Sequence, residues 1–140
     1  MLVIGSLRQQ FLYPNTKDDM SDQELLQLLE MVNVAELAER FGALDAELDW
    51  EKVLSVGEQQ RLAIARVLLE KPHYAMLDEA TIALDTANEE RLYRQLRSTS
   101  TTLVSVSHHS AIVKYHDQVL QLSGGGAWQL LPVADYRGML

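Results

Sequence analysis

Apolar residues in the first part of the chain are spaced as on one face of a helix. Ser21-Asp-Gln-Glu24 is a capping-box pattern, in which the two outer side chains satisfy free backbone N–H groups at a helix start. Behind it the apolar positions are Leu25, Leu28, Leu29 and Val32. A second short helix is predicted from Val34 to Phe41, ending at Gly42. We therefore expect residues 1–50 to be helical.

A longer apolar segment follows Trp50. Ser55-Val-Gly-Glu58 is a second capping-box pattern, and the residues behind it are apolar on nearly every side as far as Leu69. Pro72 ends the pattern, because proline cannot continue a helix. These residues predict a largely buried helix.

The next elements alternate between strand and helix. The apolar run Tyr74-Ala-Met-Leu77 closes in Asp78-Glu79 and predicts a strand. A helix is predicted from about Thr86 to Arg97, with Thr86 and Glu89 spaced as a capping box. The β-branched run Thr102–Val106 predicts another strand. Strand, helix and strand in succession indicate a parallel βαβ unit with a right-handed crossover, and hence an α/β fold.

The C-terminal part predicts a hairpin at the edge of the sheet. Gln118–Leu122 and Trp128–Leu131 are extended, mostly apolar runs on either side of Gly124-Gly125-Gly126. A phosphate-binding loop is rejected here, because no Lys-Ser or Lys-Thr follows the glycines and no helix pattern begins there.

Composition narrows the class of protein. The chain has 140 residues, 47% hydrophobic and 23% charged, which suits one globular domain. It has no cysteine, which excludes disulfides and thiolate metal sites. A net charge of -8 argues against nucleic acid and against docking on an anionic membrane surface. No apolar run is long enough to cross a bilayer, so we expect a soluble segment whose membrane association runs through another domain or protein.

Two acids end the first predicted strand of the βαβ unit. The carboxyl edge of a parallel sheet is where open α/β sheets bind ligands. Asp78 can hold Mg²⁺, which prefers oxygen ligands and few protein contacts, and Glu79 can take a proton from water. The plainer alternative is a solvated acidic pair that opens a loop.

The start of the helix after Ser55 and the end of the second strand of the βαβ unit both suggest a phosphate site. Gly57 near a helix start costs about 1 kcal/mol against alanine, which is explained if a ligand closely approaches the backbone. The helix N-terminus that begins at Ser55 is suited to an anion. His108 follows Ser107 at the same sheet edge as Asp78 and can donate to a phosphate oxygen. An ordinary capped helix and a surface histidine are the alternatives.

Four segments together resemble the ATP-binding domain of ABC transporters, in the order that this family shows. They resemble its signature motif, its Walker B strand with the catalytic glutamate, its D-loop and its H-loop. The segments are Leu54-Ser-Val-Gly-Glu-Gln-Gln-Arg61, Tyr74-Ala-Met-Leu-Asp-Glu79, Ala83-Leu84-Asp85 and Ser107-His108. The segment from Gly5 to Pro14 and the pair Asp49-Trp50 are similar to the branch of peroxisomal fatty-acyl transporters and bacterial peptide or cobalamin relatives.

The resemblance implies a role for each matching residue. Two such domains pair head to tail around two ATP molecules, and each is joined to or partnered by a transmembrane domain at the cytoplasmic face of a membrane. Catalytic roles fall to Glu79 as the base for water and to His108 at the γ-phosphate, while Asp78 would hold Mg²⁺. Residues of the signature segment and D-loop would contact the partner's ATP or the dimer interface, namely Ser55, Gly57, Glu58, Gln59 and Asp85.

The sequence also departs from the family pattern. Ile82 stands where serine is usual, and His109 stands where arginine is common. No G-x-x-x-x-G-K-[ST] pattern occurs in the 140 residues, and no glutamine matches that of the Q-loop. We therefore expect the C-terminal part of a P-loop NTPase domain, a fragment or truncated gene product that is inactive alone.

This expectation divides the chain into two parts. Residues 1–71 are predicted to form the helical subdomain with the signature motif, and residues 72–140 the mostly parallel sheet with flanking helices. A non-catalytic half-domain that dimerises with or regulates an intact ABC ATPase is the main alternative. A soluble ABC ATPase of the repair or translation type is a third, against which the acidity of the chain counts.

Overall fold

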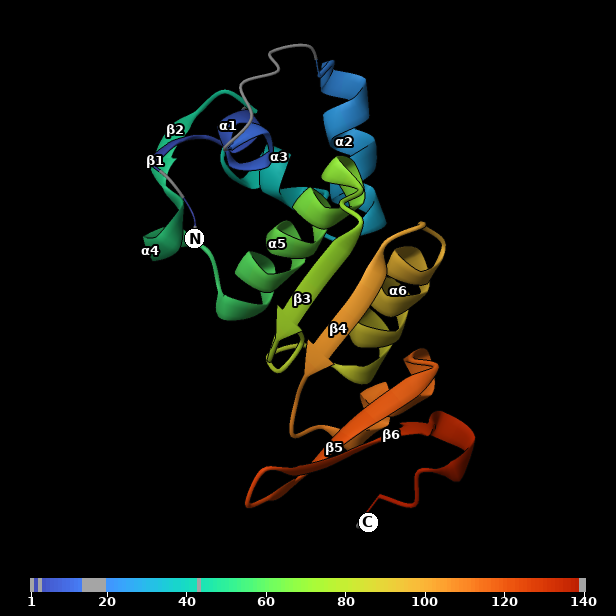
Figure 1. Ribbon diagram of the computed structural model, residues 1–140. Coiled ribbons are helices and arrows are strands. Elements are labelled where there is room, and N and C mark those ends of the chain that lie inside the picture. Colours follow the sequence, from blue (N-terminus) through green and yellow to red (C-terminus); the bar gives the residue numbers. More distant parts are fainter. Residues whose placement is uncertain (1, 3, 14–19, 43, 139–140) are drawn as a thin grey trace.

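The computed structural model describes residues 2, 4–13, 20–42 and 44–138 and shows an α/β chain (Figure 1). The helices of the first half are α1 (Leu7–Leu12), α2 (Asp22–Met31), α3 (Glu36–Arg40), α4 (Trp50–Val53) and α5 (Val56–Glu70). The expectation of an all-helical start is wrong at two places. Strands β1 (Ile4–Ser6) and β2 (Glu47–Asp49) pair antiparallel, with Gly5 opposite Leu48. Pro14, at the end of the segment Gly5 to Pro14, lies outside the described residues.

The first two predicted capping boxes are confirmed. At the start of α2 the Ser21 backbone N–H donates to Glu24 Oε2 at 2.8 Å, and the Glu24 N–H donates to Ser21 Oγ at 3.2 Å. At the start of α5, Ser55 and Glu58 make the same pair of bonds, at 2.8 and 3.2 Å. Both helices therefore begin where the sequence predicts.

The third predicted capping box is wrong, although helix α6 has the predicted bounds Thr86–Arg97. Its N-cap is Asp85, whose carboxylate accepts from the Asn88 N–H at 2.8 Å. Asn88 is therefore the third residue of the helix, and Glu89 lies one position too far along to reach back to the N-cap. Glu89 is buried instead.

A parallel pair of strands forms the centre of the molecule. Strands β3 (Tyr74–Asp78) and β4 (Thr102–Val106) run parallel, with Tyr74 opposite Thr102 and Asp78 opposite Val106. Helix α6 connects them, which confirms the βαβ unit. Alternate residues of β3 enter the core shared with α5 and α6, whereas Met76, on its other face, is 76% exposed. One face of β3 is therefore buried and the other is exposed.

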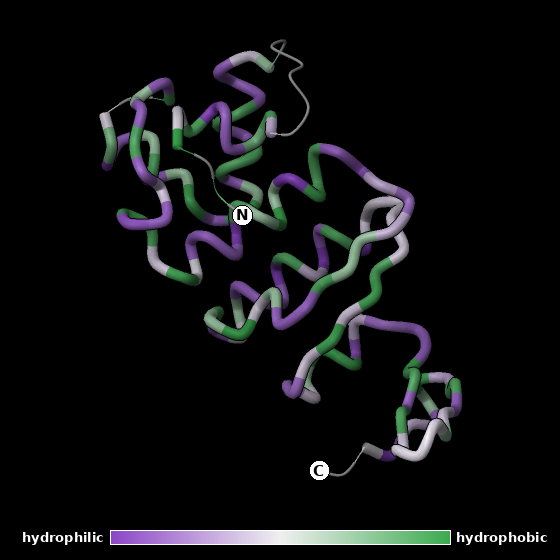
Figure 2. The backbone as a smooth tube through the Cα atoms, turned by 60° about the vertical axis from the view of Figure 1, so that its left-hand side comes forward, coloured by the Kyte–Doolittle hydropathy of each residue, from purple (hydrophilic) through white to green (hydrophobic). Residues whose placement is uncertain are grey.

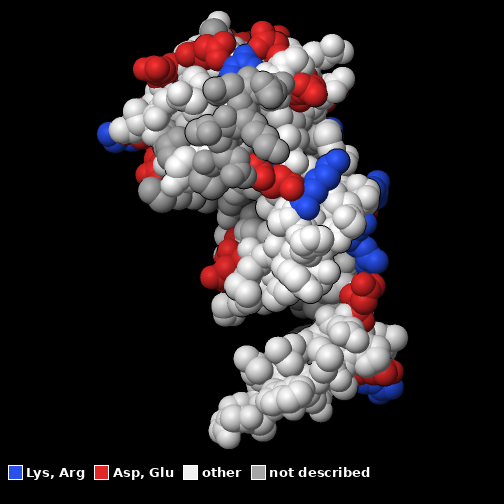
Figure 3. Space-filling model, turned by 45° about the horizontal axis from the view of Figure 1, so that its top comes forward, with Lys and Arg blue, Asp and Glu red and all other residues white. Residues whose placement is uncertain are grey.

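The hairpin is confirmed, but it is not hydrogen-bonded to the central pair. Strands β5 (Gln118–Gly124) and β6 (Ala127–Pro132) form a two-stranded antiparallel sheet of their own. The 3₁₀ helices η1 (Ser110–Tyr115) and η2 (Val133–Asp135) flank it. In Figure 3 the hairpin surface carries almost no charge, whereas acids and bases gather over the helices.

The largest group of buried side chains packs α5 against the shorter helices. Apolar and polar residues alternate along these helices, as the hydropathy colours in Figure 2 show. Trp50 is fully buried, donates from Nε1 to the Gly5 carbonyl at 2.7 Å and meets the Phe41 ring edge-on at 5.1 Å. This anchors the chain just before α5. In the part of the chain that the structure describes, no helix is long and apolar enough to cross a membrane.

Candidate functional site

Glu79 begins the turn that leaves β3. Its backbone φ is 47°, in the left-handed region that residues other than glycine, asparagine and aspartate seldom adopt. The Glu79 N–H donates to the Val106 carbonyl at 2.9 Å, which extends the β3–β4 ladder by one residue. The strand pair therefore places Glu79 beside the end of β4, where Ser107 and His108 follow.

The Glu79 carboxylate is surrounded by donors from the end of β4. Nδ1 of His108 lies 2.5 Å from Glu79 Oε1, the His108 N–H donates to the same oxygen at 3.2 Å, and Ser107 Oγ donates to Oε2 at 3.4 Å. The hydrogen bond from the His108 side chain, followed in size by that from its backbone, holds the pKa of Glu79 below its ordinary value. The structure thus brings together the two residues that the sequence predicted to be catalytic.

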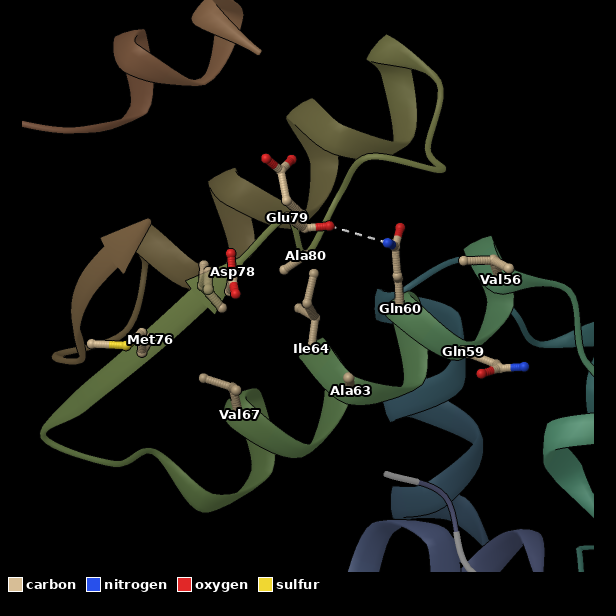
Figure 4. Close-up of a pocket in the computed structure, with 11 residues that line it drawn as sticks. Val56, Gln59, Gln60, Ala63, Ile64, Val67, Met76, Asp78, Glu79 and Ala80 are labelled. Carbon is tan, nitrogen blue, oxygen red and sulfur yellow. Dashed lines mark hydrogen bonds between the residues drawn. The ribbon is translucent and has the colours of Figure 1, made fainter. Parts of the chain in front are cut away.

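Asp78 points to a different side of the strand. It lies on the exposed face of β3 with Met76, and among the described contacts its carboxylate has no hydrogen-bond partner. In Figure 4 the Asp78 and Glu79 side chains diverge. Among the described residues no group of three or more His, Cys, Asp or Glu could enclose a metal. One accessible carboxylate nevertheless fits Mg²⁺, which keeps waters and substrate phosphates as its other ligands.

Gly57 lies against the loop that follows Glu79 in the same chain. A Cβ atom at this position would lie 3.2 Å from the Ala83 carbonyl oxygen and 3.4 Å from Leu84 Cδ2. The packing of this loop is therefore a reason for glycine at position 57 in addition to the expected ligand. Ser55, which caps the same helix, is exposed.

The other two residues of the signature segment make contacts inside the chain. The Glu58 carboxylate pairs with the Arg40 guanidinium at 2.6 Å, and this bond, against the opposing effect of burial, lowers the pKa of Glu58. Gln59 Nε2 donates to the carbonyls of Glu51 and Leu54, both at 3.2 Å.

A buried polar cluster lies behind the predicted D-loop and H-loop. The side chain of Glu89 is 2% exposed, accepts from Thr81 Oγ1 at 3.0 Å and lies 3.2 Å from His109 Nδ1. Its second oxygen, Oε1, has no partner among the described atoms. The sequence analysis missed this cluster because it assigned Glu89 to a capping box. Asp85 is exposed at the N-cap of α6, as its predicted contact with a partner requires.

Gln60 is the residue at this site that the sequence analysis did not single out. Its Nε2 donates to the Glu79 carbonyl at 3.2 Å (Figure 4). Its Oε1 accepts from the Ala83 N–H at 3.1 Å. The signal in the sequence was its spacing, since Gln60, Ile64 and Val67 are four and three residues apart on one helix face.

That helix face borders a hollow between α5 and β3. The hollow has a volume of about 440 Å³ and is lined by Ala63 and Val67 on α5, by Met76 on β3, and by Asp78 and Glu79 at its polar end. Figure 4 shows Ile64 and Val67 extending from α5 toward β3, whereas the Met76 side chain on β3 points away from the helix. The candidate base and the candidate metal ligand therefore border the same hollow.

Comparisons with known proteins agree on one family. The family model described as "ABC transporter" matches residues 3–82. An uncharacterised ABC transporter ATP-binding protein of Synechocystis is 46% identical over 94% of this chain and 20% of its own. The chloroplastic ABC transporter D family member 2 of Arabidopsis thaliana is 40% identical, over 87% of this chain and 21% of its own. The human lysosomal cobalamin transporter ABCD4 is also 40% identical, over 92% of this chain and 22% of its own.

A solved structure gives the same result. A bacterial Atm1-family ABC exporter with ATP bound superposes with a TM-score of 0.78 and 28% identity, covering 96% of this chain and 24% of the exporter chain. The chain thus spans about a fifth of the length of the curated relatives it matches.

Proposed function

This chain belongs to the ABC transporter family, and from that membership we propose that it forms part of a domain that binds and hydrolyses ATP to power transport across a membrane. The observation that carries the proposal is the contact between Glu79 and His108 at the carboxyl ends of two parallel strands. Ligands of open α/β sheets bind at such ends.

Glu79 is the proposed general base. Three donors hold its carboxylate, which is ionised near neutral pH, the form able to take a proton from water. A carboxylate with a lowered pKa is also a weak base. Moving His108 away from Glu79 would raise that pKa and make the carboxylate a better proton acceptor at the moment of attack.

His108 is proposed to contact the γ-phosphate through its other nitrogen. An ionised carboxylate only accepts hydrogen bonds, so Nδ1 of His108 donates to Glu79. In a neutral ring Nε2 is then an acceptor, and donation to a phosphate requires the doubly protonated imidazolium.

Asp78 is the proposed Mg²⁺ ligand. The ion, when bound with ATP, would neutralise phosphate charge, and the role of Asp78 is to fix its position with an exposed carboxylate oxygen. The divergence of Asp78 and Glu79 separates the metal ligand from the base.

The remaining site residues are proposed to act across a head-to-tail dimer. Ser55 and Gly57, with Glu58 and Gln59 beside them, would face the ATP of a second ATP-binding domain, and Asp85 would join the contact between the domains. Within this scheme residues 1–71 form the helical subdomain and residues 72–140 the catalytic strands. A transmembrane domain, in the same or another chain, would bring the assembly to a membrane surface.

The test uses a completed domain, in which the phosphate-loop half of the Synechocystis relative is joined ahead of this chain. Glu79→Gln should lower kcat by about 10²- to 10⁴-fold and leave ATP binding intact, because it removes only the base. Glu47→Gln, at an exposed position on β2, is the matched control. Hydrolysis at the parental rate in Glu79→Gln would refute the base. A folded completed domain that binds a second domain but hydrolyses no ATP would favour the non-catalytic half-domain.

A second measurement addresses the 140 residues alone. Most hydrogen bonds to ATP phosphates come from the backbone and lysine of a phosphate loop, and that pattern does not occur in this sequence. Titration calorimetry with Mg-ATP should therefore detect only feeble binding and no turnover. Micromolar affinity would contradict this expectation.

A further inference from the structure

Gln60 bridges the two ends of the loop that carries the proposed base. One terminal amide group donates to the Glu79 carbonyl at 3.2 Å and accepts from the Ala83 N–H at 3.1 Å. We propose that Gln60 is a positioning residue for the reaction, which fixes loop 79–83 on helix α5 and so aims the Glu79 carboxylate; this rests on the proposed function, in which Glu79 is the base.

The backbone of Glu79 needs such support. A left-handed φ of 47° is unfavourable for glutamate by about 1 kcal/mol, and such a conformation persists only where its surroundings determine it. The Glu79 N–H is held by Val106, and the Glu79 carbonyl accepts from Gln60 and, at 3.3 Å, from the Ile82 N–H. The orientation of this peptide decides where the side chain leaves the backbone. In Figure 4 the carbonyl points to Gln60 and the carboxylate points away from it.

The other end of the loop is held by the same helix. The Ala83 N–H donates to Gln60, while the Ala83 carbonyl oxygen lies 3.2 Å from where a Cβ of Gly57 would be. Gln60 and Gly57 are one helical turn apart, so both polar groups of Ala83 lie beside the same stretch of α5. A side-chain amide carries both the donor for one end of the loop and the acceptor for the other, which suits glutamine to position 60.

A merely structural role and a positioning role predict different results. If Gln60 only stabilises the fold, its removal lowers the free energy of unfolding and leaves turnover by the folded protein unchanged. If Gln60 positions Glu79, its removal lowers kcat while KM for ATP stays the same, because no contact with ATP is lost. The loss of kcat should then depend on the hydrogen bond that Gln60 donates to Glu79, and not on the one that it accepts from Ala83.

Three variants separate these roles. Gln60→Ala removes both hydrogen bonds, Gln60→Glu retains only the acceptor for Ala83, and Gln27→Ala changes an exposed glutamine on α2 as the control. Amide hydrogen exchange at Ala83 is measured by NMR on the 140-residue chain, and kcat and KM on the completed domain. Exchange at Ala83 should quicken in Gln60→Ala and stay slow in Gln60→Glu. Both variants should lower kcat about tenfold, the equivalent of one lost hydrogen bond, with KM within about twofold.

Three results for folded Gln60→Ala would each overturn the proposal: a parental kcat, a change in KM alone, or exchange at Ala83 as slow as in the parental chain. If Gln60→Ala does not fold, Gln60→Glu carries the test of kcat, since it keeps the bond to Ala83. If the parental completed domain does not hydrolyse ATP, the proposed function fails. That result is distinct from a failure of this inference, in which the parental domain is active and the Gln60 variants are equally so.

Discussion

Nδ1 of His108 lies 2.5 Å from Oε1 of Glu79, although the two residues are 29 positions apart in the sequence. The contact exists because parallel pairing puts the residue after β3 beside the residues after β4. It links the proposed base and the proposed γ-phosphate contact directly, so a change at His108 should be visible in the titration of Glu79.

Removing the histidine ring should raise the pKa of Glu79. The bond from the His108 side chain is the largest cause of its lowered value, so His108→Ala should move the carboxyl titration upward toward the ordinary value of 4.5. Carbon-13 NMR titration of the glutamate side chains measures the shift. His73→Ala, at an exposed position before β3, should leave it unchanged.

The same contact predicts how stability depends on pH. A carboxyl whose folded pKa lies below its unfolded value contributes stability above the unfolded pKa, and this stability is lost as the pH falls through the folded pKa. The parental chain should therefore lose this contribution only below about pH 4.5, and His108→Ala should show a smaller loss over that range. Urea unfolding at several pH values provides the measurement. An equal loss in both proteins would contradict the assigned cause.

His109 should stabilise the buried carboxylate of Glu89. With His109→Ala that group keeps Thr81 as a donor but loses its neighbouring ring, which should lower the free energy of unfolding by roughly 1–3 kcal/mol. His109→Arg supplies a permanent cation and should recover most of the loss. Urea denaturation of the three proteins checks this. No recovery with arginine would show that the ring is needed for its shape rather than for its hydrogen bond or charge.

Arg91 should stabilise the end of α2 from α6. Its guanidinium donates to the Glu30 carbonyl at 2.7 Å and to the Met31 carbonyl at 3.2 Å. The Glu30 carbonyl also accepts from the Asn33 N–H at 3.0 Å, and both carbonyls lie in the last turn of α2, where intrahelical partners run out. Arg91→Met should lower the free energy of unfolding by about 1 kcal/mol. Arg94→Met, on the same helix, breaks only an exposed pair with Glu90 and should change it by less than about 0.5 kcal/mol. Equal effects of both variants in thermal unfolding would contradict the capping role.

The proposed action across the dimer can be tested at Val56. A substitution at Val56 is preferable to one at Gly57, because a side chain at Gly57 would come too close to the Ala83 carbonyl of its own chain. Val56 is 61% exposed in the first turn of α5, so Val56→Asp should not destabilise the helix and should place a carboxylate beside the anion site. Val56→Asn has the same shape without the charge and serves as the control.

The decisive experiment is a mixed dimer of completed domains. One domain carries Val56→Asp, the other a broken phosphate loop, and the readout is nucleotide trapped by vanadate. Action across the dimer puts both lesions in one composite site and leaves the second site whole, so about half of the trapping should remain. Action within each chain damages both sites. Loss of all trapping, with the dimer shown to form and the asparagine control active, would count against the proposal.

Local patterns in the sequence predicted the elements well. The capping boxes at Ser21 and Ser55, the bounds of α6 and the parallel strands all rest on interactions between near neighbours or on alternation along one strand. The short strands β1 and β2 were missed because three residues give no periodicity, and their pairing depends on contacts 45 residues apart, such as Ile4 with Asp49.

The candidate site was predictable only in part. The sheet edge that joins Glu79 to His108 follows from the βαβ order, so their proximity could be expected. The bridge from Gln60 depends on how α5 is turned toward β3, which the sequence does not determine. The packing of Gly57 against the loop of Ala83 could not be expected for the same reason, since that loop comes 26 positions later in the sequence.

The left-handed backbone of Glu79 has a consequence for natural selection. Glycine or asparagine would relax that conformation, but either would remove the carboxylate and the bonds that it accepts from Ser107 and His108. Glutamate is thus held at this position against a preference of the backbone, and only a requirement for its side chain would retain it. Homologous lineages released from that requirement should drift toward glycine or asparagine here, while lineages still under it should keep an acid in a conformation that acids avoid.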